Sequence, residues 1–67
     1  MPITKAPEAL LRLDTVKART GLSRSLIYKL VSEGRFPRAL HIANTRVSVW
    51  PESAISAWIE ATIGEAA

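Results

Sequence analysis

Two stretches of the chain carry apolar residues at helical spacing. In the middle, Ile27, Leu30 and Val31 recur at i, i+3 and i+4, which predicts an amphipathic helix from Arg24 to about Glu33 with one buried face. Toward the C-terminus, the pattern predicts a last helix that starts at Pro51, where no amide donor is needed, and ends at Gly64. The buried stripe of this last helix is expected to contain Ile55, Trp58, Ile59 and Thr62.

A shorter helix is expected before the middle one, from Thr15 to Thr20. Asp14 is a good N-cap for it, because its carboxylate can accept the free amides of the first turn. Gly21 suits the left-handed backbone of a C-cap, and Ser23 is a good N-cap for the next helix. Two short helices joined by Gly21-Leu22-Ser23 predict a helix-turn-helix.

The residues after Phe36-Pro37 predict a small β-hairpin. Ala39–Ile42 fits one strand, with Leu40 and Ile42 inward and His41 outward, and Arg46–Trp50 fits the returning strand. The pattern leaves open which face of the returning strand is buried.

Charge is distributed unevenly along the chain, whose formal net charge is +3. Residues 17–46 hold seven Lys or Arg against Glu33 alone, a net charge of +6, whereas residues 47–67 hold three Glu and no base. A basic middle with an acidic end suggests one face that meets a polyanion. Composition alone fits a solvated basic surface equally well.

The second helix of a helix-turn-helix enters the major groove of DNA, and its N-terminal residues meet the base edges. The residues expected to do so here are Ser23, Arg24, Ser25, Tyr28 and Lys29. Arg can bond guanine with two hydrogen bonds, whereas Ser, Tyr and Lys can bond base edges or phosphates. A plain pair of helices with a solvated polar face is the alternative that the residues leave open.

The hairpin supplies a second set of candidate DNA contacts. Asn44, Thr45 and Arg46 occupy its tip, which can reach a minor groove or a line of phosphates, and Asn tolerates the positive φ of such a turn. The remaining candidates for contacts to the DNA backbone are Arg35, Arg38 and Lys17. A surface hairpin with solvated arginines is the alternative.

Several short motifs together resemble one known family. They are Thr20-Gly21-Leu22-Ser23-Arg24-Ser25, Ile27-Tyr28, Gly34, Phe36-Pro37, Arg46, Trp50 and Trp58. As a set they resemble the AlpA-type phage regulators, a branch of the MerR-like winged helix-turn-helix proteins that includes many excisionases. The resemblance covers about residues 11–63. It implies a single, mainly α domain with a small β-hairpin, a recognition helix at Ser23–Glu33 and a wing around Asn44–Arg46.

The chain departs from the family pattern in the wing. The family usually has Gly at the turn, where Asn44-Thr45 stands here, and an apolar residue where this chain has Ser48. Both departures concern the shape and register of the hairpin.

The resemblance implies sequence-specific binding of double-stranded DNA, by a transcription regulator or a recombination directionality factor (excisionase) of a phage or integrative element. An integrase or RNA polymerase is the candidate protein partner. We expect a monomer in solution and several copies on DNA, since no long apolar helix is available to form a dimer. The alternative from another class is a small protein–protein interaction domain that uses the same basic face.

Other functional classes fit poorly. The chain has no Cys, one His, six scattered carboxylates and no Gly-rich phosphate loop, so we expect no enzyme, no cofactor and no metal site. No run approaches the roughly 18 apolar residues of a membrane span, and no apolar signal region follows Met1, so we expect a cytoplasmic, nucleoid-associated protein of a bacterium or phage. A length of 67 residues allows one domain, which we place at 10–64 after a flexible arm at 1–9 and before a frayed tail at 65–67.

Overall fold

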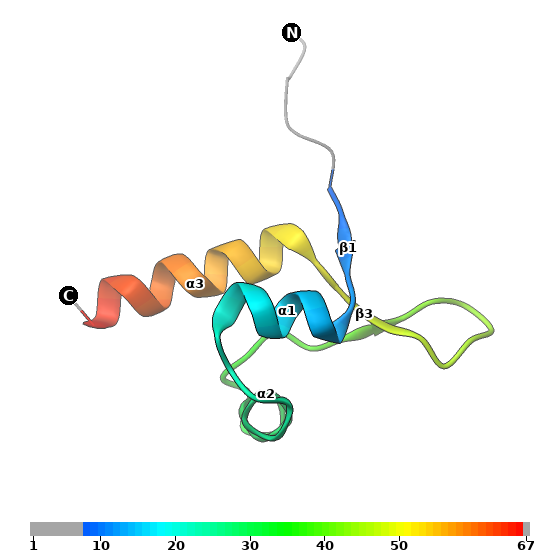
Figure 1. The fold of residues 1–67 in the computed structure, drawn as a ribbon, viewed down its shortest axis with the longest axis horizontal. Coiled ribbons are helices and arrows are strands. Elements are labelled where there is room, and N and C mark those ends of the chain that lie inside the picture. Colours follow the sequence, from blue (N-terminus) through cyan, green and yellow to red (C-terminus); the bar gives the residue numbers. More distant parts are fainter. Residues whose placement is uncertain (1–7, 67) are drawn as a thin grey trace, which may run out of the picture.

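Three helices combine with a small three-stranded sheet in residues 8–66, the part of the chain that the computed structural model describes. Figure 1 shows the helices on one side of the molecule and the β2–β3 hairpin extending from the other. The predicted class, a mainly α winged helix-turn-helix, is confirmed. The elements in chain order are β1 (Leu10–Leu11), α1 (Leu13–Thr20), α2 (Arg24–Ser32), β2 (Leu40–His41), β3 (Ser48–Pro51) and α3 (Glu52–Ala66).

Strand β3 is the centre of the sheet and pairs antiparallel with β1 on one side and β2 on the other. Trp50 lies opposite Leu11 in the first pair, and Val49 lies opposite Leu40 in the second. Opposite residues of an antiparallel pair share one face of the sheet, and neighbours along a strand alternate. Trp50 is fully buried in the core and Leu11 packs against it, but Val49 on the other face is only 3% exposed, so the returning strand is buried on both faces at this point rather than on one.

The core cluster contains one fully or almost fully buried side chain from each helix, one from β3 and one from the linker after α2. Val16 comes from α1, Ile27 from α2, Phe36 from the linker after α2, Trp50 from β3 and Ile55 from α3. These five side chains form one cluster. Because the three helices, the linker and β3 each contribute a residue to it, packing of the core fixes the position of α2 relative to β3.

The turn between α1 and α2 has the predicted geometry. Gly21 adopts φ 76°, in the left-handed region, and its N–H donates to the Lys17 carbonyl at 2.8 Å. Ser23 is the N-cap of α2, and its Oγ accepts a hydrogen bond from the Leu26 amide at 3.1 Å. The helix-turn-helix prediction and both of these caps are confirmed.

The start of α1 differs from the prediction. The helix begins at Leu13 and its N-cap is Arg12, whose carbonyl accepts a hydrogen bond from the Val16 amide at 3.0 Å. Asp14 lies inside the first turn, so its assignment as N-cap is wrong, although a carboxylate there still suits the positive end of the helix. Strand β1, which directly precedes this helix, was not predicted, because two residues are too few to show an alternating pattern.

The bounds of the other helices differ by a few residues. Helix α2 ends at Ser32 with Glu33 as its C-cap, one residue before the predicted end. Pro51 is the last residue of β3, and α3 starts one residue later. Gly64 lies within α3, which continues to Ala66, so its assignment as C-cap is wrong. The prediction that Thr62 is buried is also wrong: the C-terminal half of α3 extends beyond the rest of the domain, and Thr62 is exposed (Figure 1).

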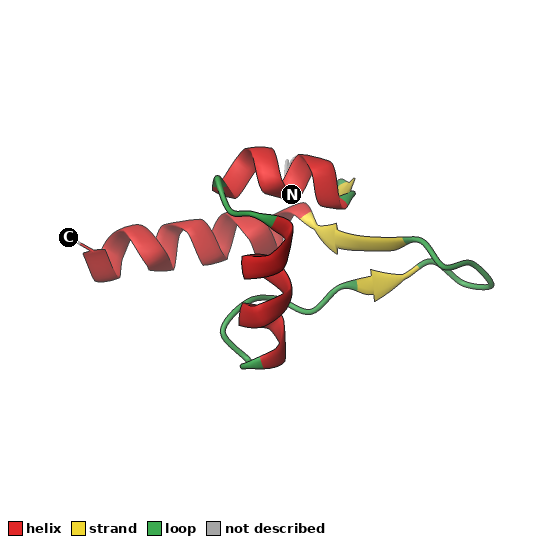
Figure 2. Cartoon of the chain, turned by 60° about the horizontal axis from the view of Figure 1, so that its bottom comes forward, coloured by secondary structure: helices red, strands yellow, loops and turns green. Residues whose placement is uncertain are grey.

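The predicted inward side of the first hairpin strand is wrong as well. Leu40 and Ile42 are 51% and 43% exposed, and His41 is exposed too. The reason is the position of β2, which contacts chiefly β3 and lies at the edge of the sheet, away from the helices (Figure 2). Alternation along a strand predicts which residues share a face, but a face is buried only where another element covers it.

Candidate nucleic-acid interface

Helix α2 presents the predicted recognition residues on its solvent side. Ile27 is completely buried and fixes the rotation of the helix about its axis. Arg24, Ser25, Tyr28 and Lys29 are all exposed. Ser23 is exposed too, but its hydroxyl is engaged in capping the helix. Four polar side chains on the first two turns of α2 are therefore accessible to a binding partner.

Two of these residues contact each other. The guanidinium carbon of Arg24 lies 5.7 Å from the centroid of the Tyr28 ring, within the range of a cation–π interaction. The two residues are four positions apart, a spacing that places side chains next to each other on a helix surface. The face of α2 is thus partly organised before anything binds to it.

The tip of the hairpin is a tight turn with an exposed arginine. Asn44 adopts φ 62°, the left-handed backbone that Asn tolerates better than most residues. The Thr45 hydroxyl donates to the Ile42 carbonyl at 2.7 Å and accepts from the Val47 amide at 3.1 Å, so it stabilises the turn itself. Arg46 is exposed beside this turn. Arg46 is therefore the charged group that the hairpin tip presents to solvent.

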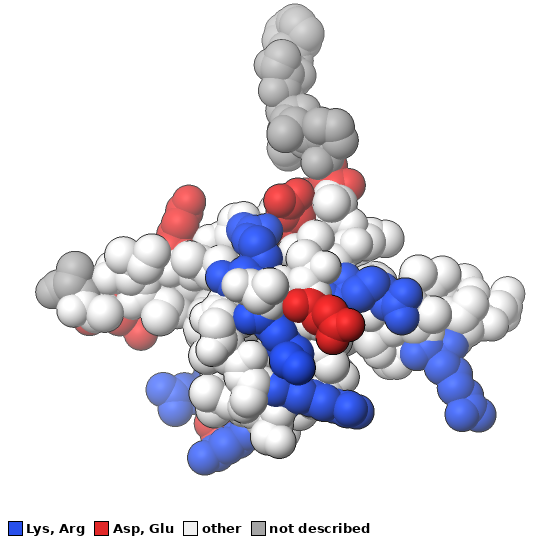
Figure 3. Space-filling model, viewed as in Figure 1, with Lys and Arg blue, Asp and Glu red and all other residues white. Residues whose placement is uncertain are grey.

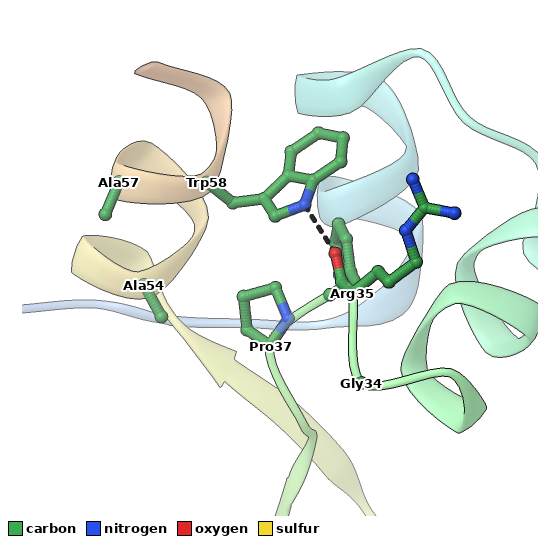
Figure 4. A pocket seen from close by; sticks show the side chains of 7 residues that line it. Gly34, Arg35, Pro37, Ala54, Ala57 and Trp58 are labelled. Carbon is green, nitrogen blue, oxygen red and sulfur yellow. Dashed lines mark hydrogen bonds between the residues drawn. The ribbon is translucent and has the colours of Figure 1, made fainter. Parts of the chain in front are cut away.

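The linker between α2 and β2 is held by two tryptophans. The Trp58 indole N–H donates to the Arg35 carbonyl, and the Trp50 indole N–H donates to the Pro37 carbonyl, each at 2.9 Å. Between these two carbonyls lies Phe36, which is buried and packs edge-on against Trp58 with ring centroids 4.9 Å apart. Figure 4 shows Trp58 reaching from α3 to this linker. The linker thus joins the recognition helix to the hairpin in one fixed conformation.

Ion pairs divide the basic residues into two groups. Arg19 lies 3.4 Å from a Glu52 carboxylate oxygen and 3.1 Å from Ser56 Oγ, so it ties α1 to α3. Arg35 forms a longer pair with Glu33, at 3.8 Å. Among residues 8–66, the basic residues that form no ion pair are Arg12, Lys17, Arg24, Lys29, Arg38 and Arg46.

These unpaired bases lie on α1 and at its N-cap, on α2, in the linker before β2 and at the hairpin tip. Lys17 is half-buried, and the others are exposed. Figure 3 shows Lys and Arg side chains spread over α1, α2 and the hairpin, with few acidic groups among them. Arg12 was not predicted as part of the site, since it lies outside the basic middle of the sequence. Arg19 contributed to the basic charge of that segment, but its pairing with Glu52 partly neutralises it.

The described residues form an open hollow beside the linker, and their potential metal ligands are scattered. Beside Trp58 lies an open hollow of about 470 Å³, lined by Gly34, Arg35, Phe36, Pro37, Ala54, Ala57 and Trp58 (Figure 4). Within residues 8–66, three or more His, Cys, Asp or Glu side chains do not gather anywhere at a spacing that would hold a metal ion. The helices of this part of the chain are all too short or too polar to span a membrane.

The fold and its exposed basic side define the class of protein. A capped second helix after a Gly-Leu-Ser turn, followed by a β-hairpin and a closing helix, is a winged helix-turn-helix domain. The chain belongs to the AlpA family: residues 9–63 match the family described as "Prophage CP4-57 regulatory protein (AlpA)". The family resemblance read from the sequence motifs is confirmed.

One curated relative comes from a phage. The chain is 38% identical over 56 residues to "Uncharacterized protein ORF88" of Enterobacteria phage P4. The alignment covers 84% of this chain and 62% of that relative, so the chain spans less than two thirds of the length of the phage protein. No solved structure matches the chain. The family is one of prophage regulatory proteins, and the relative is encoded by a phage.

Proposed function

We propose that this protein binds double-stranded DNA sequence-specifically, with α2 in the major groove and the β2–β3 hairpin on the neighbouring backbone or minor groove. The observation that carries the proposal is the exposed face of α2. Burial of Ile27 turns Arg24, Ser25, Tyr28 and Lys29 toward solvent together, at the N-terminal end that enters the groove in helix-turn-helix proteins.

The two regions are assigned different tasks. Arg24 is in the first turn of α2 and is the proposed base reader, with guanine as its preferred base. Ser25, Tyr28 and Lys29 complete that surface. The hairpin tip, with Asn44, Thr45 and Arg46, and the linker arginines Arg35 and Arg38 hold the phosphate backbone, together with Lys17.

A binding-site selection with variant proteins tests this division. Arg24→Ala should lose about 1–3 kcal/mol of preference at one base position. Arg46→Ala should weaken binding to all sequences alike, because phosphates carry no sequence information. Arg12→Ala removes the same charge from another exposed base of this surface, outside α2, and is the matched control for base reading: it should change the base preference at no position. The docking orientation is wrong if Arg46→Ala relaxes a base preference while Arg24→Ala leaves the selected motif unchanged.

Salt dependence separates DNA binding from the alternative of a protein-binding basic face. If about four to six phosphates are neutralised, the plot of log K against log salt concentration should have a slope of roughly −4 to −5. Arg46→Ala should flatten that slope by about one. A slope near zero, or no affinity for random duplex at low salt, would favour a protein partner instead.

The proposed biological role is that of a transcription regulator or an excisionase of a phage or integrative element. Both roles act on DNA in the bacterial cytoplasm, with RNA polymerase or an integrase as the protein partner. In either role we propose that the chain is a monomer in solution and binds adjacent sites on DNA in several copies. An in vitro excision reaction with the integrase, with and without this protein, distinguishes the two roles.

A further inference from the structure

A long arginine side chain that must read one base has a conformational cost. Arg24 is exposed on the first turn of α2, and among residues 8–66 no carboxylate forms an ion pair with it. A free arginine loses rotamer entropy when it binds, and this loss reduces the free energy available for discriminating among bases. A neighbouring group that restricts the guanidinium beforehand would lower that cost.

Tyr28 is placed to be that group. Its ring lies 5.7 Å from the Arg24 guanidinium carbon, one helical turn further along the same helix. The ring cannot turn into the core, since burial of Ile27 sets the rotation of α2 and leaves Tyr28 42% exposed. The Ser23 cap holds the first turn, where Arg24 begins. Backbone and ring together therefore restrict the region in which the guanidinium lies.

We infer that Tyr28 is a positioning residue, whose ring face holds the Arg24 guanidinium in the orientation that discriminates among base pairs. The inference rests on the proposed DNA-binding function and extends it. It assigns the contribution of Tyr28 to the π face of its ring. The phenolic hydroxyl is not needed for this role.

Two variants of Tyr28 separate the ring from the hydroxyl. Tyr28→Phe keeps the aromatic face, so the ratio of affinities for the preferred and a mismatched base at the position read by Arg24 should stay within about twofold of the original, even where loss of the hydroxyl lowers the affinity for all DNA. Tyr28→Leu keeps an apolar, helix-forming side chain but removes the π face, and should lower that preference by about two- to fivefold. Circular dichroism of both variants checks that the helices are retained. The inference is overturned if Tyr28→Phe loses as much preference as Tyr28→Leu, since the hydroxyl would then be the contact.

A double-mutant cycle shows whether the ring acts through Arg24. In the Arg24→Ala background, Tyr28→Leu should cause no further loss of preference. Additive losses would mean that the two residues contact DNA independently, which contradicts the inference.

Measurements on the free protein give a readout that needs no DNA. Protons of the Arg24 side chain should show ring-current shifts in the NMR spectrum that persist in Tyr28→Phe and disappear in Tyr28→Leu. Unchanged Arg24 shifts in Tyr28→Leu would overturn the inference. A wild-type protein without any sequence preference would refute the proposed function and this inference together, whereas a preference that Tyr28→Leu leaves intact would refute this inference alone.

Discussion

Replacing Trp50 by Phe tests the most deeply buried part of the fold. Trp50 is completely buried, and its indole N–H donates to the Pro37 carbonyl at 2.9 Å. Trp50→Phe keeps an aromatic ring but removes this donor. The unpaired carbonyl costs about 1–2 kcal/mol, toward the lower part of the usual range because Pro37 is only half-buried.

The smaller ring adds a second cost. Phe is about 40 Å³ smaller than Trp, and a residual cavity destabilises by about 24 cal/mol per Å³, which gives about 1 kcal/mol. The expected loss is therefore about 2–3 kcal/mol. A chain of 67 residues has a total free energy of unfolding of about 3–10 kcal/mol, so this loss is large enough to measure, and the variant stays folded where the total exceeds about 4 kcal/mol.

Urea unfolding followed by far-ultraviolet circular dichroism measures the effect, and Trp58→Phe is its matched control. Trp58 also donates its indole N–H to a linker carbonyl at 2.9 Å, but Trp58 is only partly buried and that bond is at the exposed edge of the domain. Water can replace the lost donor there, so Trp58→Phe should cost no more than about 1 kcal/mol. The reasoning is refuted if Trp58→Phe shifts the urea midpoint as far as Trp50→Phe does.

Three further outcomes are expected. Ser23→Ala should destabilise the domain by about 1 kcal/mol in the same urea assay, since it removes the acceptor for the Leu26 amide; an unchanged midpoint would show that the cap contributes nothing. The free energy of unfolding of Asn44→Gly should lie within about 0.5 kcal/mol of the original value, because Gly adopts the φ of 62° without a steric cost. Asn44→Val should have a clearly lower free energy of unfolding. Analytical ultracentrifugation without DNA should find a monomer at micromolar concentration, and a stable dimer would contradict the proposed assembly on DNA.

Local chemistry made the helix-turn-helix predictable from sequence. Gly21 supplies the left-handed backbone of the turn, Ser23 supplies the cap, and the apolar spacing around Ile27 identifies the buried side of α2. Each of these features depends only on residues within one or two turns of helix. For the same reason the exposure of Arg24 and Lys29 could be predicted, since the opposite side of an amphipathic helix follows from its buried side.

Features that depend on long-range packing were predicted less well. Strand β1 exists because Leu10 and Leu11 pair with β3, some forty residues later, and no local pattern indicates that pairing. Leu40 is exposed because no element within residues 8–66 covers it at the edge of the sheet, and alternation along the strand does not reveal this. The contact of Trp58 with the Arg35 carbonyl likewise joins two segments that are far apart in sequence. Helical spacing predicted the face of α3 on which Trp58 lies, but it did not predict the hydrogen-bond acceptor of its indole N–H.

The two indole bonds to the linker have a consequence for how the protein could change its target. The distance between α2 and the hairpin depends on three aromatic residues, Trp50, Trp58 and the buried Phe36. All three lie away from the exposed side of α2. For a protein that binds DNA as proposed, the choice of bases and the spacing of contacts along the duplex are then encoded by separate residues. Substitutions at the exposed positions of α2 can select a new operator of unchanged length, while a different operator length requires changes in the aromatic interior.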